Sequence, residues 1–465
     1  MLSLAQGNLA NLKLKVVLPF VIGCVFLTIW MNWLTASTTT LLVFYTLPLL
    51  LLIFAGPLFC SAERRFDPLE AVNFFLLAFF LMIYVGFIDS ILSGSQFVES
   101  GLLPVAIFYS VIALLAFYIG YYSGLGGAVG NLIPAYSTKW LPGRVRHIVL
   151  FYVIIGLICY AVLVVPAGGL AYVITHTSQK QQMILSKGYF VLGTNFLGLG
   201  FLIYYTHRLS LRRKPGLVFW LFLTGVLLLS LLFGSRAGVV FFAASMAIIF
   251  NYSIRRIKFS TLFIAAIVML VILALLGIYR FELGSALLGK AKLKQVPYSF
   301  IFKVFVSEHL NVTERFLLIL REVPRTIDFE KGRSYLALLC YAVPRALWPG
   351  KPEALGTVFT RAFHPASYKS GVTFGVSMLG ELYANFHFVG IIVGMFVYGL
   401  LYKIFYAYMR SNAKNAGAIL LYAMVVTPLT LGVKGGYWDI IPGLFFNVFA
   451  TLLAVRYVTG GRKAT

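Results

Sequence analysis

The chain has 465 residues, of which 60% are hydrophobic and only 11% are charged, and its mean hydropathy is +0.92. A soluble globular protein carries about 25% charged residues, so this composition excludes a soluble enzyme or binding domain. The formal net charge is +24 at pH 7. We predict an all-α polytopic membrane protein with membrane lipid as its surroundings and without a nucleic-acid partner.

Apolar runs long enough to cross a bilayer, which takes about 20 residues, follow one another along the chain. Only helices satisfy their own backbone groups in lipid, so each run predicts a transmembrane helix. The first run follows a start that is polar through Lys15, and we interpret it as an uncleaved span. The predicted spans, about twelve, are 16–35, 40–60, 71–92, 102–124, 147–166, 188–206, 217–233, 238–254, 261–279, 387–408, 416–433 and 440–457.

The positions of Lys and Arg in the short loops predict the orientation, because cytoplasmic loops carry an excess of both. With the N-terminus inside, the inner loops and termini hold twenty of these residues and the short outer loops hold four. Both termini are therefore expected in the cytoplasm, in the bacterial inner membrane. The chain divides into helices one to nine (1–279), a periplasmic loop region (280–386) and helices ten to twelve (387–465).

The loop region 280–386 holds fourteen basic and eight acidic residues. Within it, Asn311–Val323 predicts a short amphipathic helix, with Asn311 and Glu314 as a capping box. The apolar stretch Tyr335–Val343 is too short to span, so we expect it at the interface or as a re-entrant segment. The tract PRALWPGKPEALG (344–356) predicts a rigid irregular loop.

Two arginines lie beside predicted spans on the outer side. Arg236, in FGSRAG (233–238), interrupts an apolar stretch, which marks a tight turn at the outer surface because mid-membrane Arg is costly. It either points into an outer cavity or snorkels from a helix end. Arg280 follows the ninth span. Either its guanidinium group lies at the same membrane depth as that of Arg236, or it is an interfacial anchor that binds lipid phosphate.

The segment 333–361 places Arg333, Arg345, Lys351 and Arg361 among prolines and glycines. Guanidinium groups bind phosphate oxygens bidentately, and a rigid loop holds them at little ordering cost. We therefore predict substrate binding there; the alternative is a basic loop resting on anionic head groups.

Aromatic side chains in the same region can contact sugar rings. Trp348 and Tyr335 lie in or beside the irregular loop, and Tyr383 with Asn385 follows in the next motif. The alternative for the aromatic residues is an ordinary interfacial belt, where Tyr and Trp are enriched.

One acidic residue stands where a predicted span begins. Glu381, in SMLGELYANFHFVGIIVGMFVYGLL (377–401), has Gly380, Tyr383 and Asn385 as neighbours. An ionisable residue at that depth is a functional hypothesis by default. We predict proton transfer by Glu381, or a structural ion pair with an arginine; one role does not exclude the other.

Several motifs are absent from the sequence. There is no D-x-D or E-x-D, no Walker A motif and no dinucleotide fingerprint, so neither metal nor nucleotide chemistry is indicated. The four cysteines are scattered, and His309 and His364 have no metal-ligand spacing. We predict no cofactor and no metal site.

GRSYLALLCYAVPRALWPGKPEALG (332–356) followed by SMLGELYANFHFVGIIVGMFVYG (377–399) resembles Wzy-type oligosaccharide repeat-unit polymerases of O-antigen and exopolysaccharide assembly. FGSRAG is similar to a family feature as well. The strong resemblance covers roughly 330–400. It implies a membrane glycosyltransferase that transfers a glycan from undecaprenyl pyrophosphate to the non-reducing end of another lipid-linked unit. It also implies essential outer arginines, for which Arg236, Arg280 and Arg345 lie in matching contexts.

The resemblance further implies a flippase and a chain-length regulator as partners. It extends in fold to O-antigen ligases, which deliver the glycan to lipid A core, and SMLGELYANF (377–386) lacks the histidine expected there for a ligase. Without a metal motif, the arginines are expected to stabilise the leaving pyrophosphate. A ligase remains the alternative function, and a transporter is disfavoured because the sequence has no paired halves.

Overall fold

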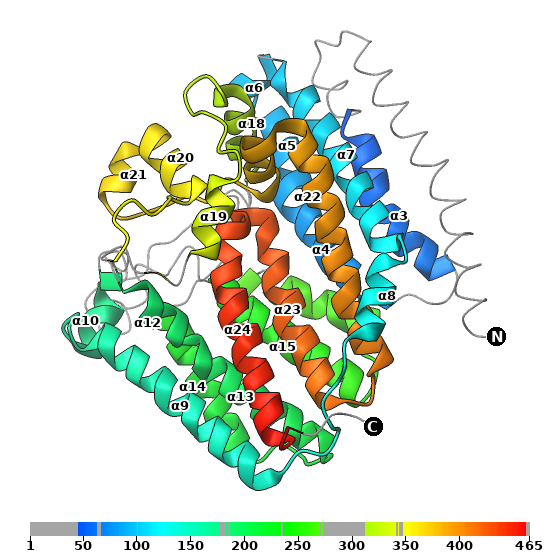
Figure 1. Cartoon of the computed structure of the whole chain (residues 1–465), viewed down its shortest axis with the longest axis vertical. Coiled ribbons are helices and arrows are strands. Elements are labelled where there is room, and N and C mark those ends of the chain that lie inside the picture. Colours follow the sequence, from blue (N-terminus) through cyan, green and yellow to red (C-terminus); the bar gives the residue numbers. More distant parts are fainter. Residues whose placement is uncertain are drawn as a thin grey trace.

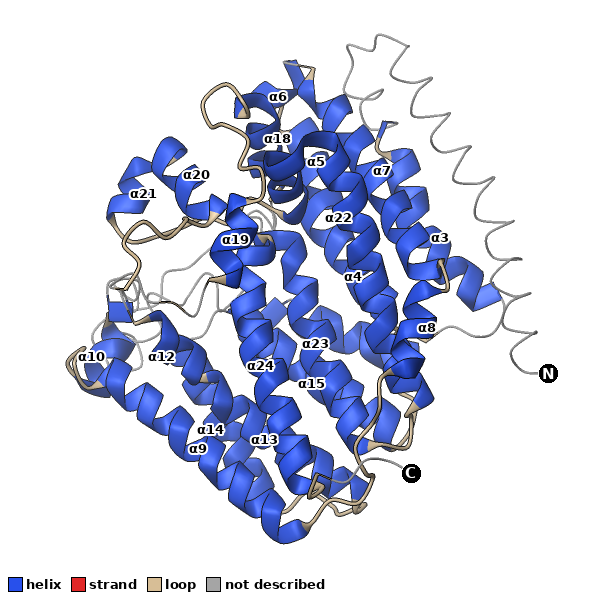
Figure 2. Cartoon of the chain, viewed as in Figure 1, coloured by secondary structure: helices blue, strands red, loops and turns tan. Residues whose placement is uncertain are grey.

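The structure is a computed structural model, and it describes residues 45–62, 67–99, 101–176, 183–184, 187–233, 236–269, 271–272, 312–340, 343 and 347–461. Long helices pack side by side as a bundle, and a layer of short helices covers one end of it (Figure 1). Every regular element among these residues is a helix (Figure 2). The predicted all-α class is therefore confirmed for the described part of the chain.

Six helices are long and apolar enough to cross a membrane, and five shorter apolar helices accompany them in the described residues. The six are Ala71–Leu92, Leu102–Tyr122, Pro142–Val164, Gly188–Ser210, Met378–Ser411 and Ala416–Gly435. The shorter ones are Leu47–Pro57, Leu217–Leu231, Gly238–Ser253, Phe259–Met269 and Gly443–Val458. Each overlaps a predicted span, whereas 16–35 lies outside the described residues. The count of twelve stays a prediction.

The helices of the bundle have the following bounds: α3 Leu47–Ala62, α4 Ala71–Phe79, η1 Phe80–Tyr84, α5 Val85–Leu92, α6 Gln96–Glu99, α7 Leu102–Tyr122, α8 Leu125–Leu132, α9 Pro142–Val164, α10 Gly169–Thr175, α12 Gly188–Gly193, α13 Asn195–Ser210, α14 Leu217–Phe233, α15 Arg236–Ser253, α22 Met378–Ser411, α23 Ala416–Gly435 and α24 Tyr437–Val458. The outer layer contains α18 Thr313–Glu322, α19 Arg333–Leu339, α20 Leu355–Phe363 and α21 Pro365–Lys369.

The core of the bundle forms where α22 packs against α7 and α8. The two long helices approach closely because each places a glycine opposite the other's backbone. A Cβ on Gly120 would overlap the carbonyl of Phe396, and one on Gly399 would overlap that of Phe117. Small residues of this kind allow the tight van der Waals packing that drives helix association in lipid. The contact fixes α22, which carries the candidate site at its first turns.

A π-helical turn, η1, interrupts the span Ala71–Leu92 and connects it to the outer layer. Such a turn disturbs the regular ladder of backbone hydrogen bonds, so an outside donor can reach a carbonyl. Thr313 of α18 provides that donor: its buried hydroxyl donates to the Ile83 carbonyl at 2.9 Å. The N-cap of α18 is Val312, without a side-chain cap. Asn311, the predicted cap, lies outside the described residues, so the capping box stays a prediction.

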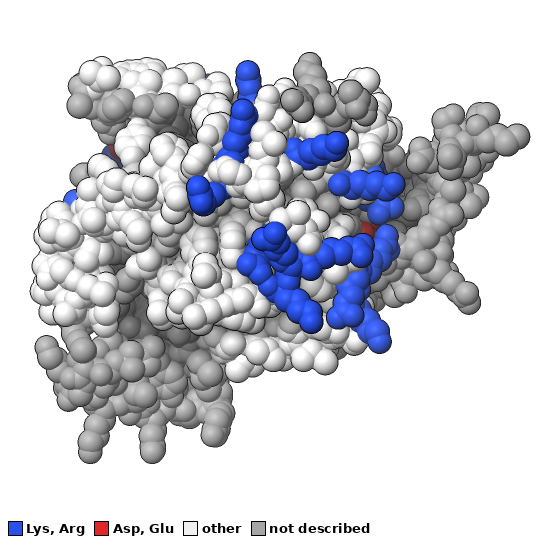
Figure 3. Space-filling model, turned by 90° about the horizontal axis from the view of Figure 1, so that it is seen from below, with Lys and Arg blue, Asp and Glu red and all other residues white. Residues whose placement is uncertain are grey.

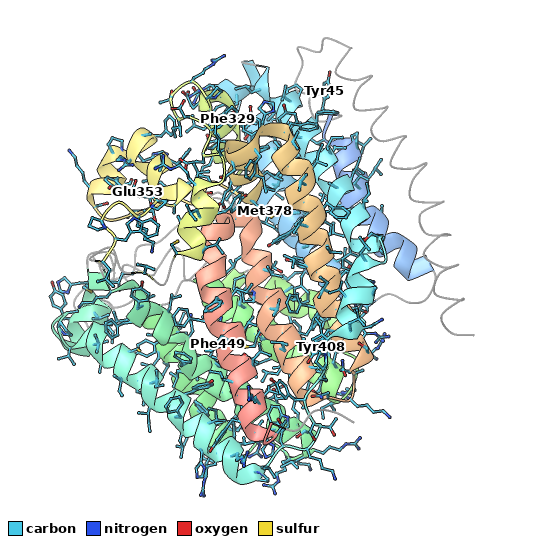
Figure 4. The ribbon with its side chains drawn as sticks, viewed as in Figure 1. Tyr45, Phe329, Glu353, Met378, Tyr408 and Phe449 are labelled. Carbon is cyan, nitrogen blue, oxygen red and sulfur yellow. The ribbon has the colours of Figure 1, made fainter. Side chains whose placement is uncertain are left out.

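In the described part of the predicted loop region, four short helices form the outer layer. The apolar stretch Tyr335–Val343 contributes only the two-turn helix α19, which begins at Arg333 and ends at Leu339. Residues 347–354 have no helix, as their prolines and glycines predict. Phe329 and Glu353 come from separate segments of this layer; in Figure 4, Phe329 lies above Met378, the first residue of α22, and Glu353 lies to its left.

The tenth predicted span begins earlier than the sequence indicates. We predict 387–408, whereas α22 begins at Met378. Phe386 and His387 have non-helical backbone angles inside it, so a short first segment, 378–385, joins the long one at a break. Hydropathy detects only the long segment, because the first one contains Glu381 and Asn385.

Basic side chains gather on the end of the bundle opposite the outer layer (Figure 3). The N-terminus of α9 and the C-termini of α13, α22 and α24 lie at this end (Figure 1). Its exposed basic residues are Lys139, Arg144, Arg146, Arg212, Arg213, Lys214, Arg255, Arg256, Lys258, Arg410, Lys414 and Arg456. All of them belong to the set predicted for the cytoplasmic side. The distribution agrees with that orientation, which itself stays a prediction.

Candidate active site

The first segment of α22 places a carboxylate in the interior beneath the outer layer. The hydroxyl of Ser377 caps this segment by accepting from the Gly380 backbone NH at 3.0 Å. One turn into the helix, Glu381 is only 2% exposed. A buried carboxylate is stable only where hydrogen bonds or charges compensate its lost hydration. We therefore expect the residues around Glu381 to provide such compensating interactions.

Ser334, at the start of α19, connects Glu381 to the outer layer. Its hydroxyl accepts from Asn385 Nδ2 at 2.8 Å. The hydroxyl proton has two acceptors within reach, Asn385 Oδ1 at 3.2 Å and Glu381 Oε1 at 3.4 Å. The same Asn385 Nδ2 also donates to the Glu381 carbonyl at 2.8 Å, and Gly332 NH donates to Asn385 Oδ1 at 3.0 Å. Asn385, predicted as substrate-binding, thus holds α19 against α22 and orients the carboxylate.

The backbone around this turn is strained. Four described non-glycine residues have a positive φ, and three of them surround the site: Lys331 at 45°, Ser377 at 66° and His387 at 55°. Such conformations cost about 1–3 kcal/mol each for ordinary residues and concentrate at functional sites. Ser377 and His387 lie at the two ends of the Glu381 segment. The strain is an independent indication that this turn has a function.

The junction of α23 and α24 closes the site on another side. Gly436 has φ +79°, and a Cβ at this position would overlap Glu381 Oε2. Only glycine permits both this conformation and this approach. Beside it lies a pocket of about 50 Å³ lined by Glu381, Gly435, Gly356 and Thr357, among others. Glu381 therefore faces a small space between α20, α22 and the end of α23.

The three predicted catalytic arginines cannot be placed against Glu381. Arg236 is the first residue of α15, but its side chain lies outside the described part of the structure. Arg280 and Arg345 lie outside the described residues altogether. Their convergence on one cavity stays a prediction, as does the catalytic role of Glu381.

Arg333 and Arg361 come together in a groove between residues 326–333 and α20. Its volume is about 320 Å³, and Asp328 and Glu330 line it as well. Arg361 also forms an ion pair with Glu353, with Nη2 2.5 Å from Oε2. Burial raises the pKa of Glu330 above its ordinary value, Arg333 opposes that shift, and Glu353 adds to it. The groove therefore has mixed charge, and the sequence prediction named only its basic residues, Arg333 and Arg361.

Lys351, Trp348 and Tyr335 lie apart from that groove. Lys351 is 8% exposed, and its ammonium group donates to the Val343 carbonyl at 3.0 Å, so it stabilises the irregular loop. Trp348 is exposed, whereas Tyr335 stacks on Phe386 with ring centroids 6.1 Å apart. Of the two aromatic residues, Trp348 is the one whose ring is exposed on the surface, where a sugar could contact it.

Tyr383 is buried in an aromatic cluster, with its ring centroid 6.0 Å from Tyr109 and 5.0 Å from His387. In this position it packs the segment and presents little surface to a ligand. Sequence reasoning missed His387, although a histidine directly after SMLGELYANF was a usable clue. His387 is exposed and has a strained backbone, and its ring centroid lies 5.7 Å from that of Phe329, which lines the groove. Ser334 and Gly436 carried no local pattern and could not have been found.

No group of three His, Cys, Asp or Glu side chains suited to a metal occurs within the described ranges. The site offers a buried carboxylate with an oriented hydroxyl, a nearby groove of mixed charge, and strained backbone at both ends. Such a carboxylate can take a proton from a hydroxyl positioned beside it. This chemistry fits the activation of an alcohol as a nucleophile.

Comparison with known proteins adds one finding. The model of the family described as O-antigen polysaccharide polymerase Wzy matches residues 16–432, which is most of the chain. No curated protein and no solved structure matches the chain. The matched range includes Glu381, Ser334 and both walls of the groove.

Proposed function

The chain belongs to the O-antigen polysaccharide polymerase Wzy family, and we propose that it joins undecaprenyl-pyrophosphate-linked oligosaccharide units into a polysaccharide. The glycan of one lipid-linked unit is transferred to the non-reducing end of another. The transfer occurs on the periplasmic face of the inner membrane, with both termini in the cytoplasm. The gathering of basic side chains at the end opposite the outer layer supports this orientation.

One observation carries the proposal within the site: a carboxylate that is 2% exposed lies between two non-glycine residues of positive φ and faces a pocket. A residue that only stabilises a membrane bundle does not require strained backbone at both of its flanks. The position under the outer layer also suits substrates that have a lipid tail in the membrane and a glycan in the periplasm.

In the proposed reaction, Glu381 accepts the proton of an acceptor hydroxyl. The hydroxyl oxygen forms a bond to the anomeric carbon of the donor glycan. The bond from that carbon to the pyrophosphate oxygen breaks, and the pyrophosphate leaves with the electron pair. Ser334 and Asn385 hold Glu381 in position through the hydrogen bonds described above. General-base assistance of this kind contributes about 10²–10⁴-fold in rate.

Arg236, Arg280 and Arg345 are proposed to bind the pyrophosphate and to stabilise its charge as it leaves. A guanidinium group binds two phosphate oxygens at once, whereas an ammonium group acts as a point charge. Arg345→Lys should therefore reduce polymer synthesis nearly as much as Arg345→Ala, by about 10²–10³-fold. Normal chain lengths in cells that express Arg345→Lys would exclude a bidentate role.

The function is tested with the purified full chain in liposomes and a defined lipid-pyrophosphate oligosaccharide as the only substrate. A ladder of products separated by repeat-unit length is expected, both with and without a chelator. A ligase would produce no ladder until lipid A core is added. A strict metal requirement would overturn the arginine mechanism, and the absence of any ladder would overturn the polymerase function.

A further inference from the structure

A groove lies between residues 326–333 and α20, close to the Glu381 turn. Its volume of about 320 Å³ is at the lower end of the range for small-molecule sites, about 300–1,000 Å³. Such a volume holds a sugar unit and excludes a polyprenyl chain. The groove lies in the outer layer, lined by residues 326–330 and 333 and by α20.

Charge distinguishes the two substrates that this groove could bind. The carboxylates of Asp328 and Glu330 balance the guanidinium groups of Arg333 and Arg361 in its lining, and Glu353 pairs with Arg361. A diphosphate carries at least two negative charges and requires an excess of cations, which this lining lacks. A neutral sugar has hydroxyls that donate to carboxylates and accept from guanidinium groups.

The lining also has an apolar part. Phe329, Ile327 and Val358 face the groove among the charged residues. A pyranose presents C–H groups on its ring faces, which pack on apolar side chains, and hydroxyls around its edge. Most small-molecule sites are lined mainly by apolar residues with a few convergent polar groups, so the many charged residues of this groove favour a ligand rich in hydroxyls.

Two connections tie the groove to Glu381. The backbone NH of Glu330 donates to the Ala384 carbonyl at 2.9 Å, and the Ser334 hydroxyl faces Glu381. On the other wall, α20 lines the groove with Val358 and Arg361 and lines the Glu381 pocket with Gly356 and Thr357. The groove and the Glu381 pocket therefore share α20 as a wall.

We propose that this groove binds the terminal sugar of the acceptor glycan, so that acceptor and donor pyrophosphate occupy separate sites. The inference rests on the proposed polymerase function and adds the location of the acceptor. Asp328 and Arg333 orient the sugar through its hydroxyls, whereas the proton of the reacting hydroxyl goes to Glu381. The donor pyrophosphate remains with the arginines outside the groove.

The test uses the full chain with repeat-unit oligosaccharide released from its lipid as the acceptor. Asp328→Asn should raise the acceptor KM about tenfold, because a hydrogen bond to a charged group is lost, and should leave the donor KM unchanged. Glu314→Gln, an acidic change on the exposed surface of α18, is the matched control and should change neither KM. A raised donor KM in Asp328→Asn, or an unchanged acceptor KM, would overturn the proposal.

Direct binding separates this inference from the proposed function. Calorimetry with the purified protein should show that Asp328→Asn binds the released oligosaccharide about tenfold more weakly than the wild type does. If the wild type forms no polymer but binds the oligosaccharide in this Asp328-dependent way, the groove assignment stands and the polymerase function fails. If polymer forms and the wild type shows no such binding, the groove assignment fails alone.

Discussion

Two buried carboxylates lie at opposite ends of α22, and their hydrogen-bond partners and backbone conformations differ. Glu381, near the start of the helix, is 2% exposed, and Asp67, which packs near its end, is 3% exposed. Asp67 accepts from the hydroxyl of Tyr252 at 2.8 Å and from the backbone NH of Leu69 at 3.2 Å. The Tyr406 hydroxyl lies 3.5 Å from the same carboxylate. Ordinary hydrogen bonds thus fix Asp67 in the loop before α4.

Glu381 has a different environment. The Ser334 hydroxyl lies 3.4 Å from its carboxylate oxygen, and the carboxylate faces a pocket. Two non-glycine residues with positive φ, Ser377 and His387, flank its helical segment. From Asp67 onward, the described residues of the loop before α4 have no positive φ. Asp67 lies among hydrogen-bond donors of the packed bundle, whereas Glu381 lines a pocket that a substrate group can enter. The comparison indicates that burial alone does not identify the functional acid.

The largest expected effect separates the two carboxylates by activity. Glu381→Gln keeps the shape of the side chain and removes its ability to accept a proton. We expect polymer synthesis to fall by about 10²–10⁴-fold, with little change in thermal unfolding in detergent. The measurement is the initial rate of ladder formation per folded protein. An unchanged rate would remove Glu381 from the mechanism and leave the two carboxylates equivalent.

Asp67→Asn is the matched change at the other end. The amide cannot accept hydrogen bonds as a carboxylate does, so the loss in the free energy of unfolding should be about 1.5–3 kcal/mol. The protein that remains folded should keep its rate, because Asp67 is remote from the pocket. Thermal unfolding and the rate per folded protein are measured together. A loss of rate at unchanged stability would mean that the inner end takes part in the reaction.

Relief of the backbone strain at His387, at the end of the Glu381 segment, should have a smaller effect, on the free energy of unfolding and on activity. His387→Gly removes a side chain that disfavours φ 55°, so the unfolding free energy should rise by about 1 kcal/mol. Arg212→Gly, at φ 50° on the basic end, is the matched control and should stabilise similarly. We expect activity to fall only in His387→Gly. Equal activity in the two variants would show that the strain at the break has no function.

The smallest effect is a pH dependence of acceptor binding. Burial raises the pKa of Glu330 above 4.5, so as pH falls it gains its proton earlier than an ordinary glutamate. Its native form binds that proton more tightly than the unfolded chain does, so stability should rise slightly as pH falls. The acceptor KM should rise over the same interval, because the carboxylate is lost. Glu330→Gln should abolish both changes; a persistent KM change would assign it to another group.

The sequence predicted the helices of the bundle well and the site only in part. Apolar runs of about 20 residues correspond to described helices wherever the two can be compared. Glu381 and Asn385 were found because polar residues beside a span are unusual. Ser334 was not found, since its role comes from contacts with residues 47 and 51 positions away. His387 was overlooked because its strain is a property of the backbone.

By itself, the sequence determined an all-helical membrane chain, the positions of its apolar helices and the excess of basic residues in the loops assigned to the cytoplasm. These properties follow from the transfer of local segments into lipid and need no knowledge of their neighbours. Tertiary structure alone decided the break in α22, the Ser334–Asn385 contact and the mixed charge of the groove. They depend on segments distant in the chain that meet only in the packed molecule, where burial and hydrogen bonding compensate local strain.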